Sequence, residues 1–225
     1  MLKRSEVNRY IQDAIAFCRQ HHFGLPPFAY WSPREWETKG HEYDEIRDCM
    51  LGWDVTDYGG GDCARLGLML FTLRNGNMQM DRYVKGYCQK LLLIGENQHT
   101  PYHFHFQKSE DIICQAGADL LVQVYNSDPQ EGLADTPVPV MTDGFWREVP
   151  AGTVIRLQPG ESITLPPYQY HQFWAEGGRS LTVEVSAVND DRTDNRFLEE
   201  VVRLPKPEPD EEPLHLLCTE YPPAG

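Results

Sequence analysis

Two histidines and a glutamate lie close together in the stretch HFHFQKSE, residues 103–110. Side chains on a β-strand alternate between its two faces, so His103 and His105 would project from one face and reach the same ion. If a tight turn follows, strand pairing would place Glu110 opposite His105 on that face. Imidazole and carboxylate groups bind transition-metal ions, and this spacing therefore predicts a metal site. The alternative is a core strand whose histidines are satisfied by hydrogen bonds.

A fourth ligand of the same kind lies far along the chain. In PGESITLPPYQYHQFW, Gly160 marks a turn, Pro166 follows it, and His171 begins another predicted strand. Three imidazoles and one carboxylate suit Mn, Fe, Co, Ni or Zn and leave about two octahedral positions open. Two adjacent oxygens of a hydroxy-carbonyl compound could fill these positions, with the cation polarising the carbonyl group.

The composition limits the classes of protein to which these residues can belong. The chain has 225 residues, of which 40% are hydrophobic, and this is enough for one large domain with its own core. A formal net charge of -14 argues against binding to nucleic acid or to an anionic membrane, because both require a basic surface. A small ligand is more compatible with this charge.

The apolar runs and the cysteines indicate the cellular compartment. No stretch of about eighteen apolar residues is present, and the opening residues MLKRSEVNRY turn polar before a signal-peptide core could form. Six cysteines are scattered singly, without a CxxC pair. A chain of this size does not need disulfides, so we expect reduced, buried thiols and a cytoplasmic location.

Three parts follow one another along the chain. Residues 1–60 contain three helix signals, the first of them an amphipathic stripe that ends near Gly24. Residues 61–190 contain short runs of β-forming residues separated by turn residues, a pattern typical of a barrel or sandwich. In residues 191–225, DDRTDNRFLEEVVRL predicts a capped C-terminal helix, and PKPEPDEEP an acidic, proline-rich tail. We expect all three parts to form one domain.

The two histidine motifs together resemble those of the cupin superfamily of β-barrel proteins. The first cupin motif, G(X)5HxH(X)3-4E(X)6G, is matched by His103, His105, Glu110 and Gly117, and the second, G(X)5PxG(X)2H(X)3N, by Gly160, Pro166 and His171. The chain departs from these motifs by seven residues instead of five between Gly95 and His103, by Tyr168 in place of a glycine, and by Ala175 in place of the asparagine. These departures concern turn shapes and leave the four ligands in order. The resemblance implies a cupin-type β-barrel, or jelly roll, but no single function, since one barrel hosts many activities.

Three longer stretches resemble the D-lyxose isomerase family of cupins. They are QKLLLIGENQHTPYHFHFQKSEDI, LQPGESITLPPYQYHQFW and VEVSAVNDDRTDNRF, although the chain has CQAGADL where the family has a run of glycines. This resemblance implies a manganese-dependent aldose-ketose isomerase with four metal ligands, His103, His105, Glu110 and His171. It also implies that Lys90, Lys108 and Glu184 are polar site residues, and we predict these three as catalytic and both lysines as substrate-binding.

Several of these polar residues also have simpler interpretations. Lys90 stands in the apolar run CQKLLLIG, where it is either an edge-strand lysine or a site residue. Lys108 on spacing alone suits a solvated turn, and its inclusion depends on the family. Asp190 suits capping at the start of the predicted helix, whereas Arg192 either pairs with acidic neighbours or binds sugar hydroxyls. We include Asp190 and Arg192 among the predicted substrate-binding residues.

The position of Glu184 is predicted from the register of a hairpin. Gly177-Gly178 in HQFWAEGGRSLTVEVS is interpreted as a two-residue turn, which places His171 opposite Glu184 on the face towards the barrel interior. A buried carboxylate needs a cation or a donor near it, and the metal with Lys90 would supply one. A slip of one residue would instead turn Glu184 to solvent.

Together these observations predict an all-β protein, a cupin-type barrel with N-terminal helices and a C-terminal helix and tail. The predicted function is a metal-dependent isomerase that interconverts D-lyxose and D-xylulose through a cis-enediolate, with D-mannose and D-fructose as a second pair. The alternatives are a cupin dioxygenase that uses Fe and O2 and a non-catalytic sugar-binding cupin. Mn is the expected cofactor, with Co, Ni, Fe or Zn as other divalent ions. A monosaccharide is the expected partner, without nucleic acid or membrane, and exposed strand edges favour a homodimer.

Overall fold

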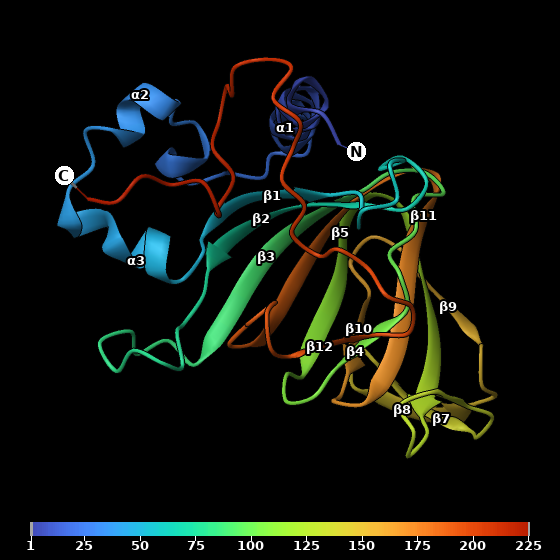
Figure 1. The fold of residues 1–225 in the computed structure, drawn as a ribbon. Helices are drawn as coiled ribbons and strands as arrows, with labels where there is room; N and C mark the ends of the chain where they lie inside the picture. Colours follow the sequence, from blue (N-terminus) through green and yellow to red (C-terminus); the bar gives the residue numbers. More distant parts are fainter. Residues whose placement is uncertain (1, 225) are drawn as a thin grey trace.

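The structure, a computed structural model, describes residues 2–224 and places helices before a large curved sheet (Figure 1). The helical elements are α1 (Arg4–Gln20), η1 (Pro27–Ala29), α2 (Pro33–Trp36), η2 (His41–Tyr43) and α3 (Asp44–Asp48). The strands are β1 (Gly52–Thr56), β2 (Leu68–Arg74), β3 (Tyr87–Ile94), β4 (His103–His105), β5 (Glu110–Ser127), β6 (Leu133–Ala134), β7 (Val138–Thr142), β8 (Phe145–Val149), β9 (Val154–Leu157), β10 (Ser162–Leu165), β11 (Gln169–Ala187) and β12 (Asn195–Phe197). This order confirms the predicted all-β class with N-terminal helices.

Helix α1 covers the outer face of the sheet because its apolar residues fall on one side. Val7, Ile11, Ala14 and Cys18 recur at intervals of three or four residues and are buried. They share one hydrophobic cluster with side chains of β1, β2, β3 and β11, among them Phe71. The helix therefore shields the first half of the sheet from water, as its sequence pattern predicts.

The sheet is antiparallel and strongly curved. Its strand order is β1-β2-β3-β11-β5-β10-β7-β8, and β4, β6, β9 and β12 pair outside this path. The two longest strands, β5 and β11, have 18 and 19 residues and pair with each other along most of their length. Positive φ angles at Gly117 (87°), Gly177 (84°) and Gly178 (134°) accompany a register shift between them. These two strands join the halves of the barrel.

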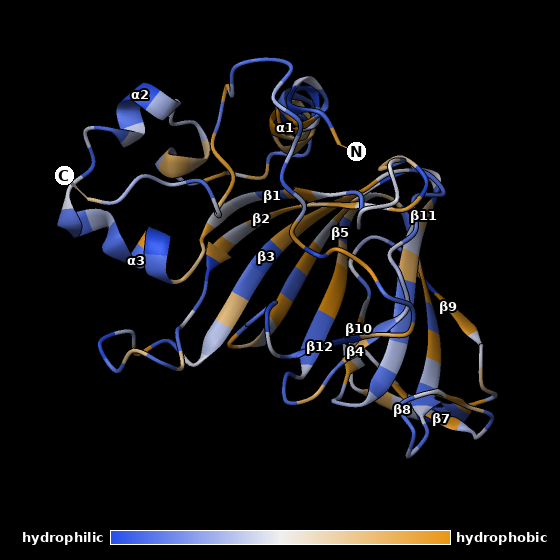
Figure 2. Ribbon diagram, viewed as in Figure 1, coloured by the Kyte–Doolittle hydropathy of each residue, from blue (hydrophilic) through white to orange (hydrophobic). Residues whose placement is uncertain are grey.

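Strands β2 and β3 are buried on both faces, which explains their nearly continuous apolar sequences. Leu70 and its partner Leu92 face the inner core, whereas Phe71 and its partner Leu91 face α1. Lys90 lies two residues before Leu92 and therefore shares its inner face. Figure 2 shows the strands as the main apolar part of the molecule, with mostly polar connections. A lysine on this face must have partners inside the barrel.

The predicted C-terminal helix is wrong. After β11 the chain forms turns and then β12, and the described residues after β12 contain no helix. In β12, Asn195, Arg196 and Phe197 pair with β4, and Phe197 packs against the inner core. Pairing with an open strand edge and burial of an aromatic ring outweigh the local helix signals of this segment.

The acidic, proline-rich tail packs in an extended form on the N-terminal elements. The tail runs back to α1, where Glu208 forms a parallel bridge with Lys3 and Asn8 Nδ2 donates to Glu212 O at 2.8 Å. It then reaches β1, where Cys218 N donates to Trp53 O. Within residues 2–224, no helix is long and apolar enough to cross a membrane.

Candidate active site

Two neighbouring strands bring three histidines together. His103 and His105 lie on β4 and His171 on β11, and these strands pair with His103 directly opposite His171. One ring nitrogen from each histidine lies within 4.8 Å of the other two. Alternation along β4 turns both of its histidines to one face, while Phe104 between them is fully buried on the other side. The predicted convergence of these three residues is confirmed.

Backbone carbonyls orient two of the three rings. His103 Nδ1 lies 2.9 Å from Pro101 O, and His171 Nδ1 lies 3.1 Å from Gln169 O. A carbonyl oxygen only accepts, so Nδ1 of each ring carries the proton and donates it. Nε2 of each neutral ring then keeps a lone pair. Outer hydrogen bonds of this kind orient imidazoles that bind metal ions.

The surroundings of His171 show that a divalent ion fits this group. His171 Nε2 is buried and has no hydrogen-bond partner among residues 2–224, although Glu110 Oε1 lies 3.1 Å away. An imidazole lone pair and a carboxylate oxygen both accept, and their close approach is unfavourable without a cation beside them. Burial lowers the pKa of His103 well below its usual value, and His171 and His105 lower it further, so this ring stays neutral and able to bind.

Glu110 joins the histidines at the start of β5. Its Oε2 lies 3.4 Å from His105 Nε2, and its Oε1 approaches His171 as described above. The predicted reason for this placement is wrong, because β5 pairs with β10 and β11 and does not pair with β4. Residues 106–109 instead form a connection that turns Glu110 inward. Glu110 therefore lies beside the histidines as predicted, but through a different strand pairing, and its role as a metal ligand stays a prediction.

Asp194, which the sequence did not single out, shapes this connection. Its Oδ1 accepts from Gln107 N at 2.8 Å and its Oδ2 from Lys108 N at 3.0 Å. The turn directs the Lys108 side chain inward, where only 2% of it is exposed. The interpretation of Lys108 as a solvated turn residue is therefore wrong. The position of Asp194 in the acidic run after β11 was the available signal, but its partners lie more than eighty residues away.

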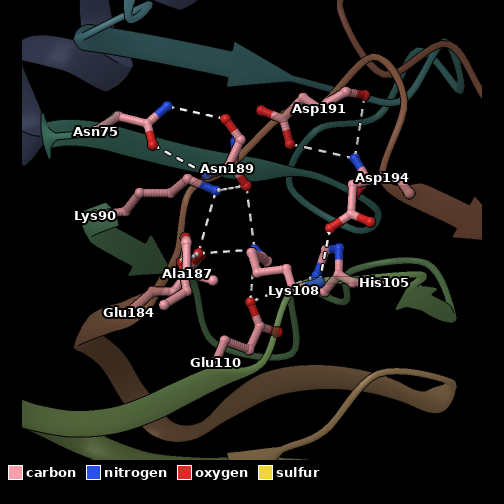
Figure 3. A network of polar contacts seen from close by, with 12 residues as sticks. Asn75, Lys90, His105, Lys108, Glu110, Glu184, Ala187, Asn189, Asp191 and Asp194 are labelled. Atoms are coloured by element: carbon pink, nitrogen blue, oxygen red, sulfur yellow. Dashed lines mark hydrogen bonds and ion pairs between the residues drawn. The ribbon is translucent and has the colours of Figure 1, made fainter. Parts of the chain in front are cut away.

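Two lysines and two glutamates form a buried charge network beside the histidines (Figure 3). Lys108 Nζ lies 2.8 Å from Glu110 Oε2 and 2.9 Å from Glu184 Oε1. Lys90 Nζ lies 3.3 Å from the same oxygen of Glu184. Strand β3 has neighbours on both sides, so the interpretation of Lys90 as an edge-strand lysine is wrong. Two positive and two negative charges balance within this network.

Mutual attraction keeps this network ionised. Burial alone would raise the pKa of Glu184, but Lys108 and Lys90 outweigh it and hold the pKa below its usual value. The pKa of Glu110 is also held well below its usual value, against burial, by Lys108 and His105. Burial would lower the pKa of Lys108, but the two glutamates hold it above its usual value. At neutral pH both carboxylates are therefore ionised and Lys108 is protonated.

An asparagine links the two lysines. Asn189 Oδ1 accepts from Lys90 Nζ at 2.7 Å and from Lys108 Nζ at 3.1 Å (Figure 3). Asn75, in the connection after β2, holds the backbone of Asn189 through two hydrogen bonds of 2.9 and 3.0 Å. Neither asparagine was predicted, although Asn189 opens the polar run that follows β11. The amide fixes the directions in which both ammonium groups point.

Glu184 faces the interior as predicted, but the predicted hairpin is wrong. Gly177-Gly178 is no turn, because β11 continues through it as one strand. His171 pairs with Val124 of β5, and Glu184 with Ile112 of β5 and with Lys90. Before the two glycines the odd-numbered Phe173 and Ala175 face the inner core, whereas after them the odd-numbered Leu181 packs in the outer cluster under α1 and the even-numbered Glu184 lines the small cavity. The bulge therefore shifts the alternation by one residue. The shift turns both His171 and Glu184 inward.

The last two predicted residues lie in an adjoining cavity of about 180 Å³ and away from the charge network. Asp190 lines this cavity, but its carboxylate accepts from Arg192 N at 3.0 Å and Thr193 Oγ1 at 2.9 Å, which is the alternative capping role. Arg192 lines the same cavity and is exposed. Their neighbour Asp191 instead lines both this cavity and a smaller one, of about 30 Å³, beside the histidines. Sequence reasoning missed Asp191.

The curved antiparallel sheet and the histidine group between β4 and β11 define a cupin-type barrel with a candidate metal centre. The solved structure of L-ribose isomerase from Cellulomonas parahominis with L-ribose has a similar fold, with a TM-score of 0.60 and 15% sequence identity. The similarity covers 92% of this chain and 98% of that one. At this identity the likeness supports the fold alone.

The chain belongs to the D-lyxose isomerase family, whose family model matches residues 2–221. A D-lyxose/D-mannose isomerase of Serratia proteamaculans is 47% identical over 223 residues, which cover 98% of each chain. A protein of the same description from Escherichia coli O157:H7 is 44% identical over the same share of both chains. This membership supports the predicted sugar isomerase and neither the dioxygenase nor the non-catalytic alternative.

Proposed function

We propose that this protein is an aldose-ketose isomerase that interconverts D-lyxose and D-xylulose, with D-mannose and D-fructose as a second pair. Two relatives described as D-lyxose/D-mannose isomerases support this choice of sugars. The observation that carries the proposal is the network of Lys90, Lys108, Glu110 and Glu184 beside the three histidines. A binding protein or a dioxygenase has no need of buried proton-transfer groups next to its metal ligands, whereas an isomerase must move a proton between two carbons.

The proposed metal ligands are His103, His105, Glu110 and His171. Three imidazoles and one carboxylate suit Mn²⁺, the proposed ion, and also Co²⁺, Ni²⁺, Fe²⁺ or Zn²⁺. When bound, such an ion would polarise the carbonyl group and an adjacent hydroxyl of the sugar. The buried, unpartnered Nε2 of His171 and the close Glu110 oxygen support this assignment.

Glu184 is the proposed general base. Lys90, Lys108 and Ser186 all contact Oε1, and Oε2 makes no hydrogen bond to any residue of 2–224. An ionised carboxylate with one free oxygen can take the proton from C2 of the aldose and return it at C1. Because Glu184 alone removes and returns the proton on one face of the sugar, the product retains part of the substrate hydrogen.

The two lysines are the proposed partners of this transfer. Lys108 is protonated and touches both carboxylates, so it can donate to the sugar oxygen at C1 that gains negative charge as C2 loses its proton. It can then recover a proton from the C2 hydroxyl, which becomes the carbonyl group of the ketose. Lys90 contacts Glu184 from the neighbouring strand and balances its charge when substrate draws Lys108 away. Asn189 keeps both ammonium groups in place through its side-chain oxygen. We also propose both lysines as sugar-binding groups.

The decisive experiment is incubation of the Mn-loaded protein with D-lyxose in D2O without oxygen, followed by NMR. We expect D-xylulose to form, with deuterium at C1 in part of the product and retained hydrogen in the rest. Absence of product, or formation of product only when O2 is supplied, would refute the proposal. Glu176→Gln is a matched control, because Glu176 lies on β11 but pairs with Arg156 at the surface.

Location and assembly are also proposed. The six cysteines are all buried and unpaired, which supports a reducing, cytoplasmic location. Strand β8 ends the sheet order and exposes 65% of Phe145 and 56% of Trp146, which supports pairing of two copies as a homodimer. Light scattering at several concentrations would test the assembly: a constant monomer mass would exclude the dimer.

A further inference from the structure

A buried arginine reaches the candidate site from the C-terminal part of the chain. After β12 the chain crosses the barrel opening, where Leu198 N donates to Tyr102 O at 2.9 Å and Val202 N donates to Tyr58 O at 3.0 Å. These contacts turn Arg203 back towards the interior, where it lines the small cavity beside the histidines. Only 11% of its side chain is exposed. A guanidinium so deeply buried requires partners on several sides.

Arg203 bridges two buried carboxylates from distant parts of the chain. Its Nη1 lies 2.7 Å from Asp54 Oδ2, on β1, and its Nη2 lies 3.0 Å from Asp191 Oδ2, after β11. The side chains of Asp54 and Asp191 are 7% and 17% exposed. Replacing such a buried ionic group with well-packed apolar residues is often neutral or stabilising. Stability alone is therefore a weak reason for this arrangement.

The position of Asp191 indicates what the arginine serves. Asp191 and Leu70 line both the small cavity at the histidines and the cavity of about 180 Å³ that adjoins it. Asn195 Nδ2 donates to Asp191 Oδ1 at 3.2 Å, and Arg203 holds the other oxygen, so the carboxylate is fixed from two sides. A sugar whose first two carbons lie at the histidines must extend its remaining carbons past this carboxylate to enter the larger cavity.

We propose that Arg203 is a positioning residue that holds Asp191 as the hydrogen-bond acceptor for sugar hydroxyls beyond C2. This inference depends on the proposed function, since it assumes that C1 and C2 lie at the histidines. An ionised carboxylate is an acceptor only, and each oxygen has a lone pair to spare for a hydroxyl. Arg203 has the forked geometry that fixes a carboxylate, which a lysine lacks. Burial would raise the pKa of Asp191, but Arg203, Lys90 and Lys108 hold it well below its usual value, so the acceptor stays ionised.

The test compares Arg203→Met and Arg203→Lys with the double variant Arg203→Met, Asp54→Asn. The double variant removes the second acid that Arg203→Met leaves unpaired, so it separates positioning from charge imbalance. We expect KM for D-lyxose to rise about ten- to a hundredfold in both methionine variants, with kcat within about threefold of the unchanged protein. Arg203→Lys should recover part of this loss, because it restores the charge without the fork.

A second measurement does not depend on turnover. D-Arabinitol, the reduced form of D-lyxose, is titrated by calorimetry, with bound metal and the circular dichroism spectrum as controls. We expect its affinity to fall as KM rises. If KM and arabinitol affinity stay within about twofold in folded methionine variants, or if kcat falls alone, the inference is overturned.

The inference can still be tested if the methionine variants do not fold or if the protein does not isomerise D-lyxose. Should both methionine variants fail to fold, Asp191→Asn, which conserves volume, decides, and unchanged arabinitol affinity in it overturns the inference. Should the unchanged protein bind arabinitol but fail to isomerise D-lyxose, the proposed function fails, and the affinities of the variants still decide the role of Arg203.

Discussion

Replacing Glu184 by glutamine removes one charge from the buried network and leaves its shape. The amide oxygen can still accept from Lys108 and Lys90, which lie 2.9 and 3.3 Å from Oε1 in the native protein. The ionised second oxygen, which we propose as the base, is lost. We expect turnover to fall by about two to four orders of magnitude, the usual effect of losing a general base. This corresponds to about 3 to 5 kcal/mol in activation free energy.

The same substitution has a smaller and separate effect on stability. Lys108 keeps Glu110 as a charged partner, but Lys90 is left with neutral partners only, at a cost of about 3 kcal/mol for a broken buried pair. For a chain of this size we expect the melting temperature to fall by about 6 to 12 °C. The protein should remain folded at 25 °C and keep its metal, because Glu184 is not a proposed ligand.

The assay is the rate of deuterium exchange and product formation in D2O, with bound metal measured by elemental analysis in parallel. Glu176→Gln serves as the control from the exposed part of β11 and should keep native turnover. Near-native turnover of Glu184→Gln with normal metal content would refute the role of Glu184 as the base. Loss of metal together with turnover would instead make Glu184 part of the metal site, and would contradict its separation from the proposed ligands.

Three further predictions concern the metal group and its support. His103→Ala and His171→Ala should each lose most bound metal, measured by elemental analysis, while staying folded. Stoichiometric metal in both variants would contradict the ligand assignment. Asp194→Ala leaves two backbone N–H groups without their acceptor. In urea titrations it should lower the free energy of unfolding by about 1 to 3 kcal/mol. Its activity should fall by a larger fraction than its free energy of unfolding. The metal-free protein should become less stable as pH falls below about 6.5. Burial lowers the pKa values of His103 and His105 in the folded protein. The unfolded chain therefore binds protons that the folded protein does not, and this favours unfolding at low pH. Equal urea midpoints at pH 7 and pH 5 would contradict this sign.

Features that depend on local periodicity could be predicted from the amino-acid sequence alone. Alternation on a strand places His103 and His105 on one face whatever the rest of the fold does. The stripe of Val7, Ile11 and Ala14 likewise defines the buried side of α1. The order of the two cupin-like motifs predicted that His171, far along the chain, would lie beside these two histidines. These features were predicted correctly because each is a property of a few neighbouring residues or of a motif.

Features that depend on contacts between distant segments could not be predicted in this way, because several segments compete for the same residues. Asp194 draws Lys108 into the interior across a separation that no local pattern reveals. The segment around Phe197 forms a strand and not a helix, because an open edge of β4 accepts its backbone hydrogen bonds. Asp191, and not Asp190, lines the small cavity at the histidines, where Arg203 holds it from the C-terminal part of the chain.

Glu184 shows how the two sources of information combine. Its charge in an apolar strand marked it as a residue that needs buried partners, and the sequence contains that information. Which face it occupies depends on the alternation along β11, and the bulge at Gly177-Gly178 shifts that alternation by one residue. A glycine pair permits either a turn or a bulge, because both use positive φ angles. The long partner strand β5, which continues past the glycines, selects the bulge, and this pairing exists only in the folded barrel.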